Sequence, residues 1–541
     1  MTRYSEDTLS ASSSEKSAHS SQTAEKRSAW TFARLMPLLL TVATLALFAL
    51  GIGVRMYDLT DQPLDFHPTR QLRSAIIARG MYYDMKPNVD LETKQQAVNY
   101  WFSMGQYEPS ILERLVAYTY LAIGKETLWV SRIYTSAFWI IGGLALFALA
   151  RRMTAGRSSG ASMAIALVAV AYYLLLPFGV QASRSFQPDP GMVMWIVLFL
   201  YAIYRWSEER AWKWAILAGL LGGLAVLTKA VAAYVVGATA IALVLHTLGI
   251  RRAWRSPQPW AMAALMVVPS GIYYIAGNES RAAEFFSSWT LSLSHLLLEP
   301  ATYARWLNLV QSLMGLAVLM LGLVGVLIAR GRNKALLVGA WVGYGIYGLF
   351  LPYQMYTHNY YHLQVVPLLA LSLVPVISAI QERFEKQAWI WKALFVGVAL
   401  MGIAYTSWVS IAEQAGENNR NEPAYWQEIA SYLPTDGKIL ALTQDYGYRL
   451  MYYGWRKVII WPIVGERQLS KLRGNDQELK TFFDKKSEGT DYFLVTAFGQ
   501  WNKQPDLQNY LNKNFPLYAQ GDGYLIYDLT QPLSAAVPAN P

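Results

Sequence analysis

The chain has 541 residues, of which 54% are hydrophobic and 15% are charged, and its formal net charge is +10. The apolar residues form long blocks, which is the composition of a membrane protein rather than of a soluble core. The basic residues lie in short loops between these blocks, so membrane topology explains the charge and no nucleic acid partner is expected. The absence of cysteine excludes disulfides, thiolate zinc sites and a cysteine nucleophile.

The first 30 residues are polar and rich in Ser, Glu and Lys, without a small-residue cleavage pattern. We therefore predict that residues 1–30 form a disordered cytoplasmic tail rather than a cleaved signal peptide. A helix needs about 20 apolar residues to cross the hydrocarbon core, and about eleven blocks meet this criterion. They lie at 32–54, 128–150, 161–180, 190–206, 213–229, 231–249, 259–277, 306–329, 335–351, 362–380 and 389–409.

The loops between these blocks predict a topology. If the N-terminus is cytoplasmic, every loop on the cytoplasmic side is basic, as short cytoplasmic loops usually are. The segment 55–127 then becomes a large first outer loop within a transmembrane domain of residues 31–410. We therefore expect a multi-pass protein in contact with the bilayer of the cell membrane, whose active site is extracytoplasmic.

Residues 411–541 differ in character, because short β-rich runs alternate with helical patterns. The predicted strands lie at 438–442, 457–461, 492–496 and 523–528, and the predicted helices include 424–432 and 506–514. This alternation indicates a small α/β domain, which the topology places outside the membrane. The predicted fold class is an α-helical polytopic membrane protein with a small extracytoplasmic α/β domain at its C-terminus.

The first outer loop contains the motif Asp65-Phe66-His67-Pro68-Thr69-Arg70-Gln71, followed by an amphipathic stretch at 72–83. A carboxylate, an imidazole and a guanidinium close together just outside the first span can bind a hydroxyl acceptor and a phosphate. A capped helix along the membrane interface with solvated charges explains the same residues about equally well. The segment Tyr107-Glu108-Pro109-Ser110 is interpreted as a turn and cap signal.

Three more charged residues lie at predicted outer turns. Arg184 and Asp189 share a short turn between two apolar blocks, and Lys229 lies in a tight hairpin near the outer interface. Charged residues at the edge of a membrane are costly and often functional. The alternatives are that Asp189 caps the helix beginning at Pro190 and that Lys229 snorkels to the interface.

The predicted outer tip at 353–362 is crowded with aromatic and hydrogen-bonding side chains, among them His358, Tyr360, Tyr361 and His362. An aromatic belt at the interface explains the tyrosines. It does not explain two histidines and an asparagine, so we interpret this tip as a contact for a sugar or a diphosphate.

In this order and spacing, the segments resemble the bacterial family 39-like glycosyltransferases of the GT-C superfamily, relatives of protein O-mannosyltransferases and of the lipid A aminoarabinose transferase. The resemblance spans roughly residues 32–375. The matching pieces are Asp65 to Gln71 with Ile76 to Arg79; Gly124 to Glu126 with Ser131 and Arg132; Ala150 to Arg152; Ser183 and Arg184 with Pro188 to Pro190; Gly219 to Lys229; and His358 to Leu363 before Pro367.

The resemblance implies an enzyme that takes a sugar from a polyprenyl-phosphate donor at the outer leaflet and transfers it, with inversion, to an acceptor of unassigned class, whether lipid, glycan or protein. In such families an acidic residue of the first outer loop is thought to activate the acceptor hydroxyl, and Asp65 is the matching position. Several relatives carry a second acid where Phe66 stands here, which leaves the assignment of the catalytic base open between Asp65 and Asp189. We predict that Asp65 is the catalytic carboxylate and that Asp189 supports it, because Asp65 lies just beyond the first span, where a lipid-linked sugar presents its anomeric carbon. No cofactor is expected, and a divalent metal is left open. The expected substrate contacts are His67, Arg70, Gln71, Arg184, Lys229, His358, Tyr360, Tyr361 and His362.

Two other classes of protein share some of these features. A transporter or flippase would also have many spans and buried charges, but here the polar residues collect at one face and no inverted repeat is visible. A non-catalytic membrane scaffold whose outer domain binds a partner is the third hypothesis. Transfer of sugar by the purified protein distinguishes the enzyme from both.

Overall fold

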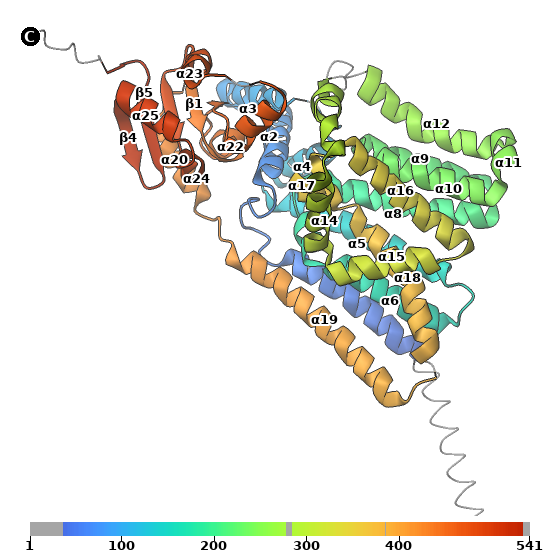
Figure 1. Ribbon diagram of the computed structural model, residues 1–541. Coiled ribbons are helices and arrows are strands. Elements are labelled where there is room, and N and C mark those ends of the chain that lie inside the picture. The colour runs from blue at the N-terminus through green and yellow to red at the C-terminus, as the bar shows by residue number, and fades with distance from the viewer. Residues whose placement is uncertain are drawn as a thin grey trace, which may run out of the picture.

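The computed structural model describes residues 36–105, 107–276, 284–384, 386–435, 437–475 and 477–533. The predicted tail at 1–30 lies outside these residues. Long helices form one part of the molecule, and a small sheet with short helices forms the other (Figure 1). The helix α19 (Trp389–Gly416) runs along the edge of the helical part and leads into the sheet region.

The predicted apolar blocks are helical wherever the structure describes them. Six helices in this part of the chain are long and apolar enough to cross a membrane, or up to eight if two bent helix pairs each count as one span. The six are Met36–Met56, α5 (Trp129–Met153), α8 (Asp189–Glu209), α12 with η1 (Pro257–Ala276), η4 with α18 (Asn359–Phe384), and α19. The remaining blocks form α9 (Trp212–Thr228), α10 (Ala232–Leu248) and α16 (Gly331–Phe350). The chain is a multi-pass membrane protein, and six to eight of its spans meet this length and composition criterion within the residues that the structure describes.

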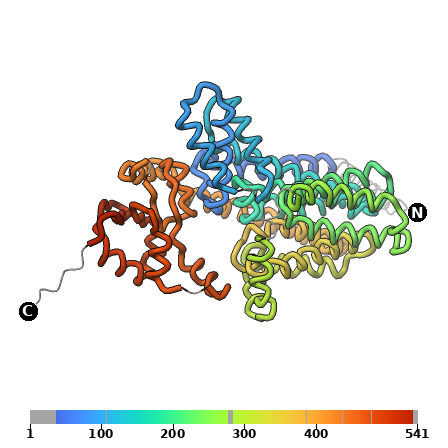
Figure 2. Tube along the Cα trace, turned by 90° about the horizontal axis from the view of Figure 1, so that it is seen from above, coloured from blue at the N-terminus to red at the C-terminus, as the bar shows by residue number. Residues whose placement is uncertain are grey.

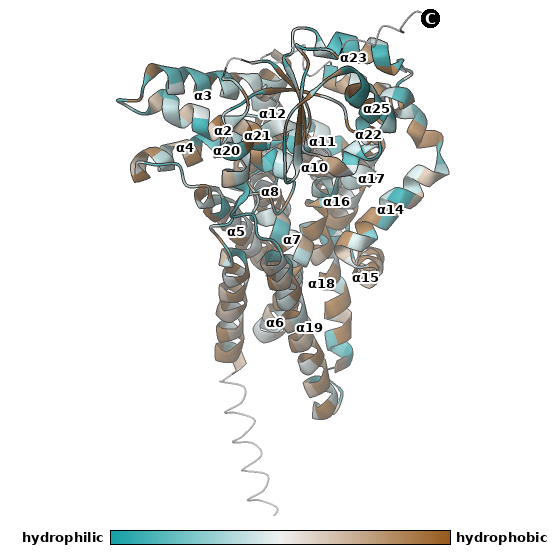
Figure 3. Ribbon diagram, turned by 90° about the vertical axis from the view of Figure 1, so that its left-hand side faces the viewer, coloured by the Kyte–Doolittle hydropathy of each residue, from teal (hydrophilic) through white to brown (hydrophobic). Residues whose placement is uncertain are grey.

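Hydropathy divides the molecule along its helices. Hydrophobic residues dominate the lower lengths of α6 (Ser159–Leu175), α18 (Val365–Phe384) and α19. Hydrophilic residues concentrate around α3 (Leu91–Ser103) and α23 (Leu479–Ser487) at the opposite end (Figure 3). Along α19, large apolar side chains such as Met401 and Trp408 are 65% and 71% exposed. Exposed apolar surface of this kind fits contact with lipid.

A 60° bend separates α6 from α7 (Pro177–Ser183). Pro177 has no N–H, so the carbonyl of Tyr173 lacks its helical donor. The indole Nε1 of Trp139 donates to this carbonyl at 3.1 Å, and Arg55 Nη1 donates to the carbonyl of Leu174 at 2.9 Å. Arg55 also donates from Nε to Ser183 Oγ at 2.7 Å. A buried guanidinium from the first span thus stabilises the bend on both sides.

The second bent pair corrects the single span predicted at 306–329. The structure contains α14 (Pro300–Met314) and α15 (Leu316–Ile328), which meet at an angle of 101°. Gly315 between them has φ +82°, a conformation that favours glycine. Hydropathy alone did not reveal this bend, because apolar residues continue on both sides of the glycine.

Three helices of the first outer loop lie together: α2 (Pro68–Met85), α3 (Leu91–Ser103) and α4 (Ile111–Ile123) (Figure 2). Every residue of α2 from Gln71 to Tyr82 is buried, because α3, α4 and α21 (Tyr448–Tyr453) pack against it. The alternative of a capped helix with solvated charges is therefore wrong for Arg73 and Arg79, which are buried. The polar side of α2 is covered by a helix far along the chain, which the local pattern did not indicate.

The C-terminal part contains a five-stranded sheet in the order β2-β1-β3-β5-β4. Its strands are β1 (Ile439–Leu442), β2 (Val458–Ile460), β3 (Tyr492–Val495), β4 (Leu517–Gly521) and β5 (Tyr524–Asp528). β1 pairs in parallel with β2 and β3, whereas β5 pairs in antiparallel fashion with β3 and β4. Four of these strands were predicted; β4 was missed because it is an edge strand without buried residues.

Short helices accompany the strands. They are α20 (Glu422–Ser431), η5 (Gln444–Gly447), α21, α22 (Val464–Leu472), α23 (Leu479–Ser487), α24 (Phe498–Trp501) and α25 (Pro505–Asn514). The predicted helices at 424–432 and 506–514 correspond to α20 and α25. Because β1 and β3 are parallel, their carboxyl ends meet at one edge of the sheet, and η5 follows β1 there.

Candidate active site

A buried ion pair joins the first turn of α8 to the end of α9. Lys229 Nζ donates to Asp189 Oδ1 at 2.8 Å, and the two side chains are 7% and 1% exposed. The second carboxylate oxygen of Asp189, Oδ2, is buried without a hydrogen-bond partner. The Lys229 ammonium also lies 4.9 Å and 5.1 Å from the ring centroids of Tyr360 and Tyr361. The pair therefore combines a shielded cation with a carboxylate oxygen that is free to accept a proton.

A second ion pair lies beside the same tyrosines. Arg70 Nη2 contacts Glu108 Oε1 at 2.9 Å, and the Arg70 guanidinium lies 5.8 Å from the ring centroid of Tyr360. Burial raises the pKa of Glu108, but the charges of Arg70 and Lys229 outweigh it and lower that pKa to about 2. Glu108 is therefore ionised at neutral pH.

Two histidines complete this group. His67 adopts φ 48° just before α2, and its Nε2 is hydrogen-bonded to Asn359 Oδ1 at 2.5 Å. Its ring packs edge-on against Tyr360 at 4.7 Å, and the ring of His358 lies 5.6 Å from that of Tyr360. Burial, together with the nearby cations, lowers the pKa of His67 and lowers that of His358 to about 4. His358 is therefore neutral at pH 7.

These residues come from four separate regions of the chain and meet around the two tyrosines. We call them the tyrosine-centred cluster, which consists of His67, Arg70, Glu108, Asp189, Lys229, His358, Asn359, Tyr360 and Tyr361.

Asp65 lies in a different environment, the arginine-bound cluster, formed by Asp65, Arg132 and Arg184. Its Oδ2 contacts Arg132 Nη2 at 3.0 Å and Arg184 Nε at 3.8 Å, and its Oδ1 accepts from Gln71 Nε2 at 3.0 Å. Arg184 also donates to the side chain of Gln414, near the end of α19. Both oxygens of Asp65 are thus engaged, and Arg184 pairs with Asp65 rather than with Asp189.

Two of the predicted substrate contacts are fully buried and hydrogen-bonded within the protein. Gln71 donates to Asp65 and to the carbonyl of Phe66, and its Oε1 accepts from the backbone N–H of Phe186. His362 is hydrogen-bonded to Tyr344 at 2.8 Å and to the carbonyl of Met355 at 3.0 Å. These contacts favour supporting roles for Gln71 and His362.

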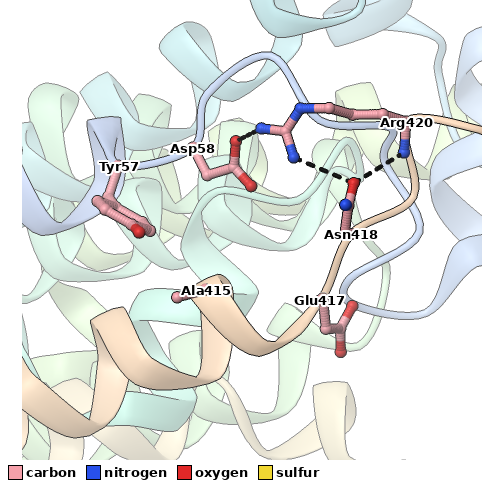
Figure 4. Close-up of a pocket in the computed structure, with 6 residues that line it drawn as sticks. All are labelled: Tyr57, Asp58, Ala415, Glu417, Asn418 and Arg420. Atoms are coloured by element: carbon pink, nitrogen blue, oxygen red, sulfur yellow. Dashed lines mark hydrogen bonds and ion pairs between the residues drawn. The ribbon is translucent and has the colours of Figure 1, made fainter.

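A cavity of about 340 Å³ lies next to the arginine-bound cluster. It is lined by Tyr57, Asp58, Ala415, Glu417, Asn418 and Arg420 (Figure 4). The side chain of Asp58 pairs with Arg420, while its carbonyl accepts hydrogen bonds from Arg132 and Arg184. Burial and the charges of Asp65 and Asp61 raise the pKa of Glu417. The ion pair between Asp58 and Arg420 therefore joins the segment after α19 to the loop that carries Asp65.

Within the residues that the structure describes, no three His, Asp or Glu side chains gather closely enough to hold a metal ion.

Sequence reasoning missed the parts of the site that depend on long-range packing. Glu108 was interpreted as a turn signal. No local sequence pattern indicates its ion pair with Arg70, because the two residues are 38 positions apart. Arg132 was named from the sequence only as one of the residues that match the family, without a role in the site. Asn359 was noted among the polar residues of the outer tip, and its partner His67 lies 292 positions away.

Comparison with known proteins finds a family whose sequence profile matches part of the chain. The sequence profile of the dolichyl-phosphate-mannose-protein mannosyltransferase family matches residues 111–275, which include Asp189 and Lys229. No curated protein sequence matches the chain.

Two solved structures have the same fold. ArnT from Cupriavidus metallidurans in the apo state is 14% identical, with 92% of this chain and 98% of that chain covered and a TM-score of 0.53. The archaeal oligosaccharyltransferase AglB from Archaeoglobus fulgidus, in complex with an inhibitory peptide and a dolichol-phosphate, is 12% identical over 94% of this chain and 75% of that chain, with a TM-score of 0.56. The chain therefore has the same fold as these two structures, the GT-C membrane fold that the sequence resemblance predicted.

Proposed function

We propose that this protein transfers a sugar from a polyprenyl-phosphate-linked donor to an acceptor hydroxyl, with the tyrosine-centred cluster as its active site. The observation that carries the proposal is the buried Asp189–Lys229 pair, in which one carboxylate oxygen has no partner. ArnT from C. metallidurans is also known in a form bound to undecaprenyl phosphate. A polyprenyl phosphate bound by a protein of the same fold supports this class of donor.

The cations of the cluster suit the carrier phosphate. Lys229 and Arg70 both lie against Tyr360, and charge-assisted hydrogen bonds from an ammonium and a guanidinium hold a phosphate strongly. In the proposed transfer the bond between the anomeric carbon and the phosphate oxygen breaks. The phosphate leaves with the electron pair, and the two cations stabilise its added charge.

The carboxylate of Asp189 accepts the proton of the acceptor hydroxyl through its free Oδ2 as the acceptor oxygen bonds to the anomeric carbon. Attack opposite the leaving phosphate inverts the configuration of that carbon. Asp65 is assigned a positioning role instead, because Gln71, Arg132 and Arg184 already engage its oxygens. Asp65 was predicted from the sequence as the catalytic carboxylate with Asp189 in support, and the proposed assignment exchanges these two roles.

The remaining parts of the proposal concern location and cofactors. We infer from the basic loops that the N-terminus lies in the cytoplasm and that the cluster, with the sheet region, lies on the extracytoplasmic side of the cell membrane. The transmembrane part comprises residues 31–410 and the α/β domain residues 411–541. No cofactor is assigned, and transfer that persists in EDTA is the expected result.

The test is transfer of a radiolabelled sugar from undecaprenyl phosphate to the native cell-envelope fraction by the purified full-length protein in lipid nanodiscs. Asp189→Asn keeps the size of the side chain but removes the base, so turnover should fall by roughly 10²–10⁴-fold. Asp65→Asn should lower stability more than turnover of the folded fraction. Wild-type turnover in Asp189→Asn, together with loss of turnover in folded Asp65→Asn, would move the base to Asp65. Absence of transfer by the wild-type protein with every labelled donor would contradict the proposed activity.

A further inference from the structure

A second group of tyrosines lies beside the active site and takes no part in the proposed transfer. Tyr446 and Tyr448 belong to the sheet region, and Tyr107 belongs to the first outer loop. Tyr107 and Tyr446 are 56% and 48% exposed. The ring centroids of Tyr446 and Tyr448 are 6.3 Å apart. Burial raises the pKa of Tyr448 and the charge of Arg73 lowers it, and the Arg73 guanidinium also lies against the ring of Tyr107. We call these three residues the tyrosine face.

Tyr446 is held by an unusual turn at the carboxyl end of β1. Asp445, Tyr446 and Gly447 have φ values of 51°, 56° and 74°. A non-glycine residue in this conformation costs on the order of 1–3 kcal/mol and persists only where surrounding contacts impose it. Those contacts are the ion pair of Asp445 with Arg449 at 2.6 Å and close packing of Gly447, where an added Cβ would lie 2.2 Å from Val458 Cγ2. The turn therefore presents an exposed aromatic ring in a fixed position.

A direct hydrogen bond ties this turn to the active site. Thr69 Oγ1, at the start of α2, donates to Asp445 Oδ1 at 2.9 Å. Thr69 lies between His67 and Arg70, which both contact the ring of Tyr360. The tyrosine face thus lies next to the tyrosine-centred cluster, on the side of the sheet region.

Charged groups surround the exposed rings. The Arg73 guanidinium lies 5.2 Å from the ring centroid of Tyr107, and the carboxylate of Glu466 interacts with Tyr446. Asp445 lies next to Tyr446 in the same turn. This combination suits a sugar ring, which has an apolar C–H face for an aromatic ring and a rim of hydroxyls for carboxylates and guanidinium groups.

We propose that the tyrosine face binds a carbohydrate, so that the acceptor of the transfer is a glycan. This inference rests on the proposed function and specifies the acceptor at that site. The acceptor sugar stacks on Tyr446 and Tyr107, and one of its hydroxyls extends toward Asp189.

The test measures retention of the full-length protein, in nanodiscs containing undecaprenyl phosphate, on two immobilised panels. One panel carries mono- to tetrasaccharides, and the other carries serine- and threonine-containing peptides. The variants are Tyr446→Ala, Tyr446→Phe and Tyr107→Ala. Tyr518→Ala is the matched control, because Tyr518 is 51% exposed and lies on β4 at the far edge of the sheet. Binding of undecaprenyl phosphate is measured in the same samples.

The wild-type protein should be retained by at least one saccharide. Tyr446→Ala and Tyr107→Ala should each weaken this retention by up to about tenfold, since the loss of an aromatic contact costs about 0.5–1.5 kcal/mol. Tyr446→Phe and Tyr518→Ala should retain it. Retention by peptides alone, or saccharide retention that Tyr446→Ala leaves unchanged, would overturn the inference while carrier binding persists. Failure of the wild-type protein to bind the carrier would instead contradict the proposed function.

Discussion

At the scale of single residues, the proposed transfer depends on how the protein holds charged side chains at the edge of the membrane. Asp189 and Lys229 were both singled out from the sequence, because charged residues are costly there. Their pairing was not predicted, since the two residues are 40 positions apart and only the packing of α8 against α9 joins them. Arg184 and Asp189 share a short turn in the sequence, but Arg184 pairs with Asp65.

The first prediction separates the structural contribution of the pair from its chemical one. Lys229→Gln leaves the Asp189 carboxylate buried without its cation, which should lower the free energy of unfolding by about 3–5 kcal/mol. Adding Asp189→Asn should restore most of that stability, because no uncompensated charge remains. Transfer should stay absent in the double variant. Thermal unfolding and sugar transfer are measured on the same preparations, and recovery of transfer along with stability would show that the pair is only structural.

The second prediction concerns the stability of the folded protein at acidic pH. The pKa of His358 in the folded protein is lowered to about 4 by burial and nearby cations, against an ordinary value of 6.5. Between these values the unfolded chain binds a proton that the folded chain does not, so the free energy of unfolding falls as the pH drops through this window. His358→Gln should lose less stability than the wild-type protein between pH 7 and pH 4.

Melting temperature against pH measures this difference, with exposed His246→Gln as the control. Parallel curves for the wild-type protein and His358→Gln would rule out the contribution of this histidine.

At the scale of secondary structure, hydropathy predicted where the helices lie but not how they bend. The apolar blocks continue through Pro177 and Gly315, so each was predicted as one span, whereas the structure bends by 60° and 101° there. The strands of the sheet were predictable because β-rich runs alternate with helical patterns. The burial of α2 was not predictable, because the helix that covers it lies in the C-terminal part of the chain.

The third prediction tests the α6–α7 bend. Removing the guanidinium in Arg55→Met leaves the carbonyl of Leu174 and the hydroxyl of Ser183 without their donor. This should cost about 1–3 kcal/mol for each unsatisfied buried group. Thermal unfolding in detergent should therefore show a lower melting temperature for Arg55→Met than for the control Arg157→Gln, whose exposed ion pair with Glu382 contributes little. Equal melting temperatures would mean that the bend does not depend on Arg55.

At the scale of the whole molecule, the GT-C fold places residues from distant parts of the chain at one end of the helical part. The segment 55–127, the start of α8, the end of α9, the segment before α18 and the sheet region all contribute to the site or to the tyrosine face. The sequence order of the motifs indicated the fold, because those segments recur in order in the family that the chain resembles. It did not indicate the sheet region as a contributor, since the resemblance ended near residue 375.

The fourth prediction tests the topology. Lys213 lies in the first turn of α9, next to the basic loop that follows α8, and Lys503 lies in the sheet region; both are exposed. Because the chain has no cysteine, single Lys213→Cys and Lys503→Cys variants can be labelled selectively. An impermeant maleimide should label Lys503→Cys in intact spheroplasts and Lys213→Cys only after lysis. The opposite pattern would reverse the proposed orientation.

The central claim is that the tyrosine-centred cluster binds the carrier phosphate, and native mass spectrometry of carrier binding tests it most directly. The full-length protein, released from nanodiscs that contain undecaprenyl phosphate, should retain one carrier molecule. Lys229→Gln and Arg70→Gln should each weaken binding by about tenfold or more, because each loses a charge-assisted hydrogen bond worth about 1.5–3 kcal/mol. Lys213→Gln, an exposed lysine outside the cluster, should bind as the wild-type protein does. Equal carrier binding by all four proteins would contradict the claim.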